Sequence, residues 1–253
     1  LSDYQSEVTK FDNESKELGN WYVGQKQGEI WGYETYGLFQ SEQEIAGAAN
    51  QDKVSGGIKL MPGDIRFVDR NNDGVIDWGD NTVDNPGDKK IIGNSTPRYH
   101  YGINLGADWK GFDLGIFFQG VGKRDLYLPG TSFRSHYGSE WQVPSAYNND
   151  YWTEENTGAY FPRARFNGGS AINQAQTRYM VDASYCRLKS VSIGYTLPKV
   201  LTQKASIEKI RIYFTGENLF TISDTPDGLD PELDSPYTYP MQRSLSVGLS
   251  LTF

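Results

Sequence analysis

Residues 244–253 read Ser-Leu-Ser-Val-Gly-Leu-Ser-Leu-Thr-Phe, and this stretch decides the fold. Every odd-numbered position is apolar, and every even-numbered position is small or polar. Because successive side chains of a β-strand point to opposite faces, this period of two predicts a strand with two different environments. A half-buried strand of a soluble sandwich is one interpretation. A strand crossing a membrane in a β-barrel needs about 9–11 residues, and a barrel can also place a terminal Phe253 in an aromatic girdle.

The same alternation recurs upstream and predicts an all-β, antiparallel architecture. With the final stretch, the predicted strands lie near residues 21–39, 98–108, 111–120, 180–197, 208–219 and 243–253. The first of these is rich in aromatic residues but alternates poorly. We expect consecutive strands to pair into a curved sheet with Leu245, Val247, Leu249 and Leu251 facing lipid and Ser246 and Ser250 facing the lumen. Lipid-exposed open edges are not tolerated, so the sheet must continue into another part of the protein.

Composition excludes several classes of protein. The 253 residues include 28 Gly, 17 Tyr, 12 Phe and 6 Trp, which favours β-structure. The net charge of −8 argues against a nucleic-acid partner, and no run of 18 apolar residues predicts a transmembrane helix. Cys186 is the only cysteine, and His100 and His136 are the only histidines. The sequence therefore shows no zinc cluster, no nucleophile elbow and no nucleotide fingerprint, and we expect no enzyme activity.

The connections between the predicted strands alternate between short and long. Short turns follow residues 108 and 197, whereas 41–96, 121–178 and 221–242 are long. Outer-membrane barrels have short periplasmic turns and long extracellular loops. If the last strand ends in the periplasm, all three long stretches lie outside the cell. The chain begins at Leu1 without Met or a signal peptide, so we expect a fragment or a processed piece.

Residues 69–80 read Asp-Arg-Asn-Asn-Asp-Gly-Val-Ile-Asp-Trp-Gly-Asp and resemble the calcium loop of an EF-hand. Gly74 stands at the sharp turn and Ile76 at the hydrophobic eighth position. The candidate ligands are Asp69, Asn71, Asp73, the carbonyl of Val75, Asp77 and Asp80. No amphipathic helix flanks the loop, and Asp80 replaces the usual Glu. The choice lies between a Ca²⁺ site that orders the loop and an Asx-rich turn without metal.

The long stretch 121–178 is rich in aromatic residues and arginines. Trp141, Tyr151 and Trp152 are candidates for contact with a sugar or a protein partner, with the two tryptophans as anchors. The alternative is that these rings pack on one another and stiffen a large loop. For any single ring the packing interpretation is favoured.

Several segments, in order along the chain, resemble the C-terminal part of SusC/RagA-type TonB-dependent outer-membrane transporters. These segments are 32–41 (GYETYGLFQS), 62–69 (PGDIRFVD) running into 72–77 (NDGVID), 91–94 (IIGN) with Pro97, 111–114 (GFDL), 117–120 (FFQG), 188–198 (LKSVSIGYTLP) and 216–220 (GENLF). Each motif alone is weak, but the ordered set covers nearly the whole chain.

The resemblance implies the C-terminal fragment of a transmembrane β-barrel of the roughly 22-stranded, plugged class, without its plug domain. It implies import of oligosaccharides or peptides across the outer membrane of a Gram-negative bacterium. The implied partners are a SusD-like surface lipoprotein, the TonB complex acting through the missing N-terminal part, the remainder of the barrel and outer-membrane lipid.

Two other interpretations remain. A secreted, soluble calcium-binding β-module, such as an adhesin or a carbohydrate-binding domain, would explain the acidic loop and the aromatic residues. It would leave the final strand and the alternation of short and long connections unexplained. A β-sandwich glycoside hydrolase would need paired carboxylates, and the sequence singles out no pair.

Overall fold

The computed structural model describes residues 1–128, 150–165, 170–202, 206–233, 238–239 and 241–253. The chain forms two compact units. Unit 1 consists of Leu1–Tyr4, Pro97–Arg124 and Asp182–Phe253, and unit 2 consists of Gln5–Thr96 and Asp125–Val181. We describe each unit by itself. Among the described residues, no helix combines the length and the apolar character needed to cross a membrane.

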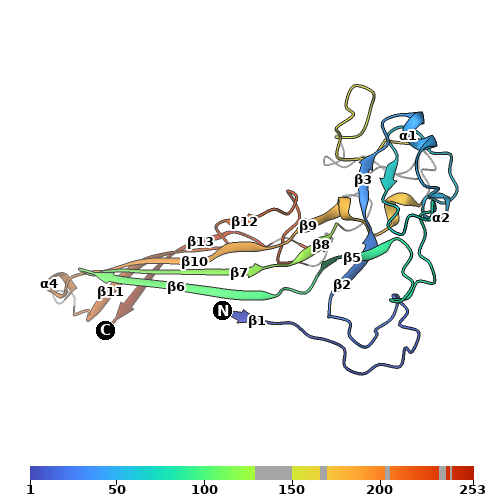
Figure 1. Cartoon of the computed structure of the whole chain (residues 1–253). Helices are drawn as coiled ribbons and strands as arrows, with labels where there is room; N and C mark the ends of the chain where they lie inside the picture. Colours follow the sequence, from blue (N-terminus) through green and yellow to red (C-terminus); the bar gives the residue numbers. More distant parts are fainter. Residues whose placement is uncertain (129–149, 166–169, 203–205, 234–237, 240) are drawn as a thin grey trace. The chain divides into compact units, whose positions relative to one another are not determined.

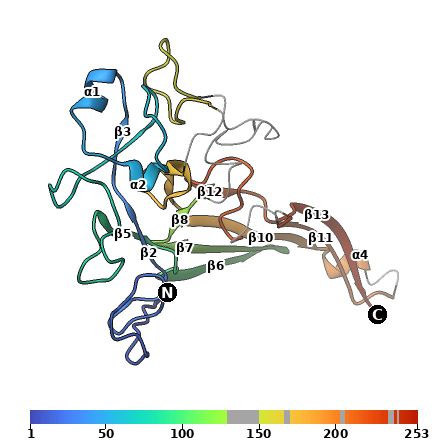
Figure 2. The same cartoon turned by 90° about the vertical axis from the view of Figure 1, so that its right-hand side faces the viewer.

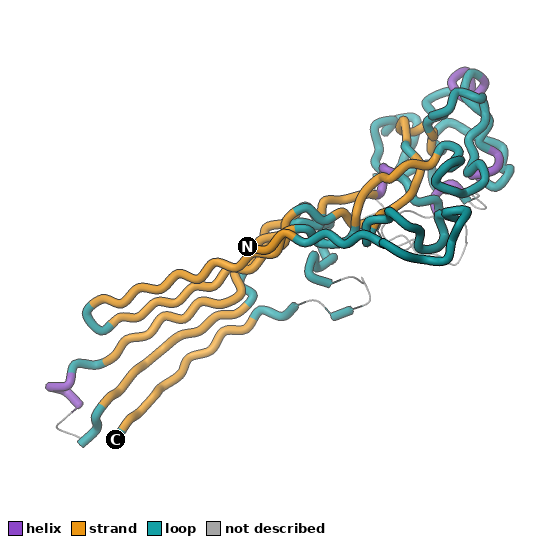
Figure 3. The backbone as a smooth tube through the Cα atoms, turned by 60° about the horizontal axis from the view of Figure 1, so that its bottom comes forward, coloured by secondary structure: helices purple, strands orange, loops and turns teal. Residues whose placement is uncertain are grey.

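Unit 1 is built on one antiparallel sheet (Figures 1 and 3). Its strands, in spatial order, are β1 (Ser2–Asp3), β6 (Tyr99–Trp109), β7 (Phe112–Gly122), β10 (Tyr185–Thr196), β11 (Lys209–Glu217) and β13 (Ser244–Thr252), and β12 (Thr221–Ser223) also pairs with β10. The five long strands lie where alternation predicts them. From β6 to β13 each pairs with the next long strand along the chain, as expected.

The connections of this sheet follow from local residue chemistry. Lys110 and Gly111 join β6 to β7, and both have positive φ angles, 48° and 89°. A two-residue hairpin turn of this kind matches the right-handed twist of the strands, and it requires left-handed backbone. After β10, Pro198 cannot continue the ladder, and α4 (Lys199–Thr202) follows.

Unit 2 contains short paired strands, short helices and long connections (Figure 2). β2 (Glu29–Tyr33) pairs with β5 (Lys89–Asn94), β3 (Thr35–Leu38) with β4 (Ile65–Phe67), and β8 (Asp125–Tyr127) with β9 (Met180–Asp182). The helical elements are α1 (Glu42–Ala46), α2 (Asp52–Ser55), η2 (Ala171–Asn173) and η3 (Thr177–Tyr179). The Ser41 hydroxyl accepts a hydrogen bond from the backbone N–H of Glu44 and so caps α1.

Three strand predictions need correction. The stretch 21–39 is not a strand of the large sheet: it forms β2 and β3, which pair with β5 and β4 inside unit 2. The neighbour of β6 is the two-residue β1 instead. The stretch 41–96 contains α1, α2, β4 and β5 and is not a plain loop, and 180–197 divides into β9 and β10. The poor alternation of 21–39 has a physical cause, because Tyr22, Tyr33 and Phe39 are buried in a core of unit 2 whereas other rings of the stretch are exposed.

That core belongs to unit 2. Its fully or almost fully buried apolar side chains include Tyr33, Phe39, Val54, Ile65, Ile76, Ile172 and Tyr179. Two buried glutamines form hydrogen bonds to the backbone. The side chain of Gln51 donates to the Ile65 carbonyl, and that of Gln176 donates to the Ala171 carbonyl. Buried polar groups cost little when they are hydrogen-bonded, so these amides stabilise the connections that lack regular structure.

Candidate functional site

The large sheet has two chemically distinct faces. Opposed residues of paired antiparallel strands project to the same side, so the register fixes which side chains share a face. Leu249 is opposite Ile212, which is opposite Tyr195, which is opposite Phe112. We call this the apolar face; its residues are Ile103, Leu105, Ala107, Phe112, Leu114, Ile116, Phe118, Val191, Ile193, Tyr195, Ile210, Ile212, Phe214, Leu245, Val247, Leu249 and Leu251.

The apolar face is exposed. Leu245 is 62% exposed, Val247 79% and Leu249 59%, and Leu105 on β6 is 53% exposed. Contiguous exposed apolar surface of this kind marks contact with a membrane or with another apolar surface.

The other side of the sheet, the polar face, carries Ser246 and Ser250 together with Thr215, Ser192, Asn104 and charged residues. Arg211 on β11 pairs with Asp113 on β7, and Arg211 Nε lies 2.9 Å from Asp113 Oδ2. The two strands are separated by β10, and Gly194 of β10 lies beneath the pair. A Cβ at Gly194 would come within 2.4 Å of Asp113 Oδ2 and 2.5 Å of Arg211 Nε. Glycine is therefore required there for the pair to form.

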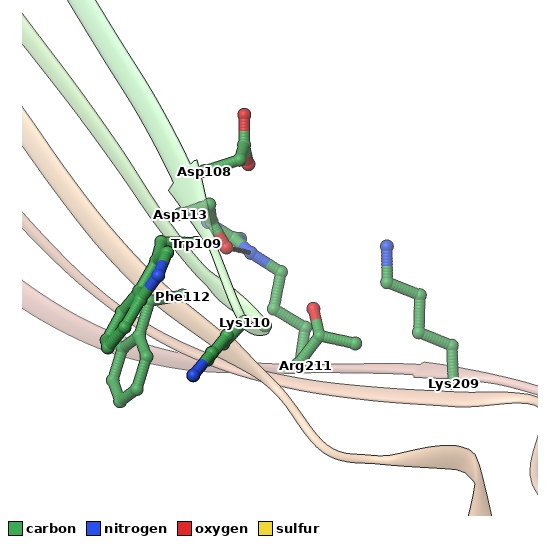
Figure 4. A pocket seen from close by; sticks show the side chains of 9 residues that line it. Asp108, Trp109, Lys110, Phe112, Asp113, Lys209 and Arg211 are labelled. Carbon is green, nitrogen blue, oxygen red and sulfur yellow. Dashed lines mark hydrogen bonds and ion pairs between the residues drawn. The ribbon is translucent and has the colours of Figure 1, made fainter.

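A hollow of about 380 Å³ lies at the β6–β7 turn (Figure 4). Asp108, Asp113, Lys209 and Arg211 contribute charged groups to its lining. Trp109 and Phe112 are opposed residues of the hairpin, and their rings are 67% and 51% exposed. The end of the sheet thus combines exposed rings with charged side chains, a combination suited to the boundary between lipid and water.

A buried ionic cluster lies at the opposite end of β10. The Arg187 side chain is 4% exposed and forms ion pairs with Asp230, at 2.6 Å, and with Glu232. Arg187 Nε also donates to the Thr221 hydroxyl, at 2.7 Å. This cluster fixes the segment after β12 to the sheet. Sequence reasoning missed it, because an arginine on an alternating strand looks like any polar-face residue.

The acidic loop adopts a tight turn. Asn72 and Gly74 have φ angles of 59° and 85°, as a sharp turn at Gly74 requires. Asp69 accepts hydrogen bonds from the N–H groups of Asn72 and Gly74, at 2.7 and 2.9 Å. The Asn71 amide donates to Asp73 Oδ2, and Asp73 Oδ1 accepts from the Val75 N–H. The structure therefore brings Asp69, Asn71 and Asp73 together.

The remaining predicted ligands have other partners. Lys53 Nζ lies 2.6 Å from Asp77 Oδ2, and this hydrogen bond, together with one from the Gly79 N–H, lowers the pKa of Asp77. Asp80 accepts from the Asn85 amide at 2.9 Å. No cluster of three or more His, Cys, Asp or Glu side chains forms within the described part of the chain. A metal at this loop would depend on Asp69, Asn71 and Asp73 and on a reorientation of Asp77.

Asp88 organises the same loop, and sequence reasoning missed it. This carboxylate is fully buried and accepts hydrogen bonds from the N–H groups of Arg70, at 2.7 Å, and Asp77, at 2.8 Å. Ile76 is also fully buried, and its N–H donates to the Asn50 carbonyl. The loop is therefore held by protein contacts at both of its ends.

The predicted aromatic contacts have different locations. Trp141 lies outside the described residues. Tyr151 is 41% exposed, whereas Trp152 is 3% exposed and does not present its ring to solvent. The Trp152 ring packs on Gly63 and on the Arg163 guanidinium, and its indole N–H donates to the Gln40 side chain at 3.2 Å. The packing interpretation holds for this residue, because an indole with its N–H satisfied gains most from burial.

Comparison with known proteins agrees with these observations. The TonB-dependent receptor P3 of Formosa agariphila is 31% identical over 248 residues, which cover 91% of this chain and 22% of the receptor. The chain resembles TonB-dependent receptors over most of its length. The TonB-dependent receptor SusC of Bacteroides thetaiotaomicron is 29% identical over 192 residues, or 74% of this chain and 17% of SusC. No protein-family model matches the chain.

Solved structures show the same fold. The RagAB peptide transporter superposes with a TM-score of 0.64 at 21% identity, over 92% of this chain and 24% of the matched chain. The RagAB peptide importer in its open-open state gives 0.63 at 20% identity, over 100% of this chain and 24% of that one. The predicted resemblance to SusC/RagA-type TonB-dependent transporters is confirmed. The chain spans less than a quarter of the length of each of these TonB-dependent receptors and RagAB chains.

Proposed function

We propose that this chain forms part of the barrel wall and outer loops of an outer-membrane importer for oligosaccharides or peptides. The importer works with a SusD-like surface lipoprotein and draws energy from TonB. The observation that carries the proposal is the exposed apolar face of the large sheet. The similarity to TonB-dependent receptors and to RagAB supports it.

In this proposal the apolar face meets lipid and the polar face meets the lumen. Leu245, Val247, Leu249 and Leu251 then face lipid, and Ser246 and Ser250 face the lumen. Aromatic residues lie at both ends of β6, Tyr101 at one and Trp109 at the other. The eight-residue span between them measures about 26 Å along the strand, and a tilt of about 40° shortens it to about 20 Å across the membrane. That height is comparable with the apolar band of roughly 25 Å in outer-membrane barrels.

The orientation follows from the connections. The β6–β7 turn and the carboxyl end of β13 lie at the same end of the sheet, since Trp109 is paired with Phe112 and Lys209 with Thr252. We assign this end to the periplasm. Unit 2 and the segment 221–242 then belong to the extracellular side, where the exposed Tyr151 is available to the lipoprotein or to substrate.

We also propose that the acidic loop binds Ca²⁺ weakly, through Asp69, Asn71, Asp73 and the Val75 carbonyl. Asp77 becomes a further ligand, directly or through water, when its ion pair with Lys53 breaks. Asp80 becomes one when its hydrogen bond from Asn85 breaks. Extracellular calcium modules have dissociation constants on the order of 10⁻⁴–10⁻³ M. The role of the ion is to order the loop.

The membrane assignment is tested by a matched pair of charged substitutions. Leu249→Arg places a charge on the apolar face, and Ser246→Arg places the same charge on the polar face of the same strand, opposite the uncharged Thr215. Arginine on the lipid side of a barrel costs about 2–4 kcal/mol near the membrane midplane. We expect Leu249→Arg to reduce the amount of folded barrel in outer membranes and Ser246→Arg to leave it unchanged. Equal loss in both variants would refute the assignment of faces.

The import assignment needs a separate measurement. Cells that lack the full-length protein should lose growth on a defined oligosaccharide or peptide as sole nutrient, and the wild-type gene should restore it. The same growth defect is expected when TonB is absent. The secreted calcium-binding module is not favoured by the comparisons, and it predicts a protein that stays monodisperse without detergent.

A further inference from the structure

Unit 2 contains a hollow of about 350 Å³ that the proposed function has not used. It lies between the paired strands β3 and β4 and residues 157–159. The side chains that matter here are Tyr36, Gln40, Glu44, Arg66 and Arg178. The volume is at the lower end of the range for small-molecule sites, about 300–1,000 Å³.

The position of Tyr36 comes from an irregularity in the strand pair. Thr35 is opposite Phe67 and Gly37 is opposite Arg66, so Tyr36 is an extra residue in a β-bulge. Gly37 follows with a φ of 105°, a conformation that a residue with a Cβ adopts only with strain. Bulges re-aim side chains, and this one leaves the Tyr36 ring 73% exposed at the rim of the hollow.

Arg66 lies beside that ring with its donors available. Its guanidinium carbon lies 4.8 Å from the centre of the Tyr36 ring and 5.8 Å from the centre of the buried Phe39 ring. Within the described residues, the guanidinium of Arg66 forms no ion pair. The two rings pack against this cation, and a guanidinium that packs on rings can still donate its N–H groups to an acceptor.

The charge balance of the hollow is positive, although the whole chain carries −8. Arg178 donates to the carbonyls of Tyr160 and Ala159, at 2.6 and 2.7 Å, and the carboxylate that interacts with it electrostatically, Asp150, does not line the hollow. Glu44 is the one acidic residue of the lining, and its carboxylate accepts the Gln40 N–H at 2.9 Å. Two guanidinium groups thus face one carboxylate that is already hydrogen-bonded.

The hollow is held rigidly. The Gln40 side chain donates to the Leu38 carbonyl at 2.8 Å and to the Thr157 carbonyl at 3.4 Å, and it accepts from the Trp152 indole. It therefore links the end of β3 to the opposite wall. A site whose walls are fixed before binding loses little conformational entropy when a ligand enters.

We propose that this hollow binds a carboxylate-bearing sugar, with the carboxylate on Arg66 and the sugar ring against Tyr36. A carboxylate accepts two parallel N–H bonds from one guanidinium edge, and the net positive charge attracts it. The exposed flat ring of Tyr36 offers a surface on which a sugar ring can stack, and it lies beside the charged group that would hold the carboxylate. The inference rests on the proposed importer function only for the source of the ligand, since binding is measurable without transport.

Binding of trigalacturonate to the full-length protein in detergent tests the proposal, with its methyl ester and triglutamate as comparison ligands. The key variant is Arg66→Gln. Arg70→Gln is the matched control, because it removes the same charge from an exposed arginine of the same unit. We expect Arg66→Gln to weaken trigalacturonate binding about tenfold or more, the loss of one charge-assisted interaction, and Arg70→Gln to leave it within about twofold. The methyl ester should bind wild type as weakly as trigalacturonate binds Arg66→Gln.

A second variant tests the ring. Tyr36→Ala should weaken binding of trigalacturonate, whereas Tyr36→Phe, which keeps the ring, should bind like wild type. Unchanged binding in Arg66→Gln, or no binding by wild type at millimolar trigalacturonate, would overturn the proposal. Triglutamate bound equally well, with the same dependence on Arg66, would overturn the sugar assignment. If these binding results hold but cells that lack the protein still grow normally on the nutrient, the proposed function fails and this binding site stands.

Discussion

The two units of this chain place their apolar residues in opposite ways. Most of the buried apolar side chains of the described residues belong to unit 2, whereas the apolar face of unit 1 is exposed from β6 to β13. Unit 2 thus carries a core of its own, built on long-range contacts between irregular segments. Unit 1 has regular hydrogen bonding but fewer buried apolar side chains, and its apolar face is exposed. In the proposed function lipid covers that face, whereas protein covers the apolar side chains of unit 2.

The largest expected effect concerns the buried ionic cluster of Arg187. Arg187→Met leaves the buried Asp230 carboxylate without its cation, whereas Glu232 keeps its ion pair with Lys189, at 2.7 Å. Breaking a buried pair in this way costs about 3–5 kcal/mol. Thermal unfolding in detergent should show the loss, and Arg98→Met, which breaks an exposed pair with Asp3, is the control. If both variants unfold alike, the cluster does not hold the segment after β12.

A pair of truncations addresses the comparison directly. Ile76→Ala empties a fully buried position of unit 2 and should cost about 2–5 kcal/mol. Leu249→Ala removes similar volume from the apolar face, where lipid chains refill the space, so we expect a change below about 1 kcal/mol. Unfolding in lipid vesicles measures both. A large loss for Leu249→Ala would mean that protein, and not lipid, covers that face.

Calcium should affect unit 2 alone. At about 10 mM Ca²⁺ and a dissociation constant of 10⁻⁴–10⁻³ M, bound ion stabilises the acidic loop by about 1.4–2.7 kcal/mol. Hydrogen exchange of the amides of residues 69–80 should slow, with no change in β6 to β13. Asp73→Ala should abolish the effect, and Asp84→Ala should keep it. Equal hydrogen-exchange rates in Ca²⁺ and in chelator would show that this loop does not bind the ion.

The smallest expected effect is a pH dependence in the ionic cluster. Burial would raise the pKa of Asp230, but hydrogen bonds from Arg187 and from the N–H groups of Glu232 and Met241 outweigh it and lower this pKa. The stabilising contribution is therefore present above the unfolded pKa of about 3.9 and is lost as the pH falls toward the folded value. Unfolding of wild type should become easier below about pH 4 by more than that of Asp230→Asn. Parallel curves would show that Asp230 does not contribute.

The long strands of unit 1 were predictable because alternation is a local signal. Each long strand from β6 to β13 has one apolar and one polar face, so apolar and polar residues alternate along its sequence. The Leu188–Ser190 bulge, which shifts the pairing of β10 with β7 by one residue, was not predictable because a single extra residue leaves no period in the sequence. β1 was missed because two residues carry no period.

The arrangement of unit 2 could not be predicted from the sequence, because its contacts join residues that are far apart along the chain. The backbone N–H of Tyr33, for example, donates to the carbonyl of Ala175, which is far away in the sequence. The burial of Trp152 depends on Gly63 and Arg163, which no local pattern connects with it. Within the acidic loop, spacing predicted the sharp turn at Gly74, but it could not show that Asp77 is paired with Lys53.

The crossing of Arg211 to Asp113 over Gly194 has a mechanical consequence. Ladder hydrogen bonds repeat along a strand, so neighbouring strands can slide by two residues and form an equivalent set of bonds. The ion pair spans three strands obliquely, and after such a slide Lys209 or Tyr213 would take the place of Arg211, neither of which has the guanidinium fork that binds both oxygens of Asp113. The ion pair therefore resists shear of the sheet along the strand direction. Because Gly194 has no side chain, the two charged groups can meet over the backbone of β10.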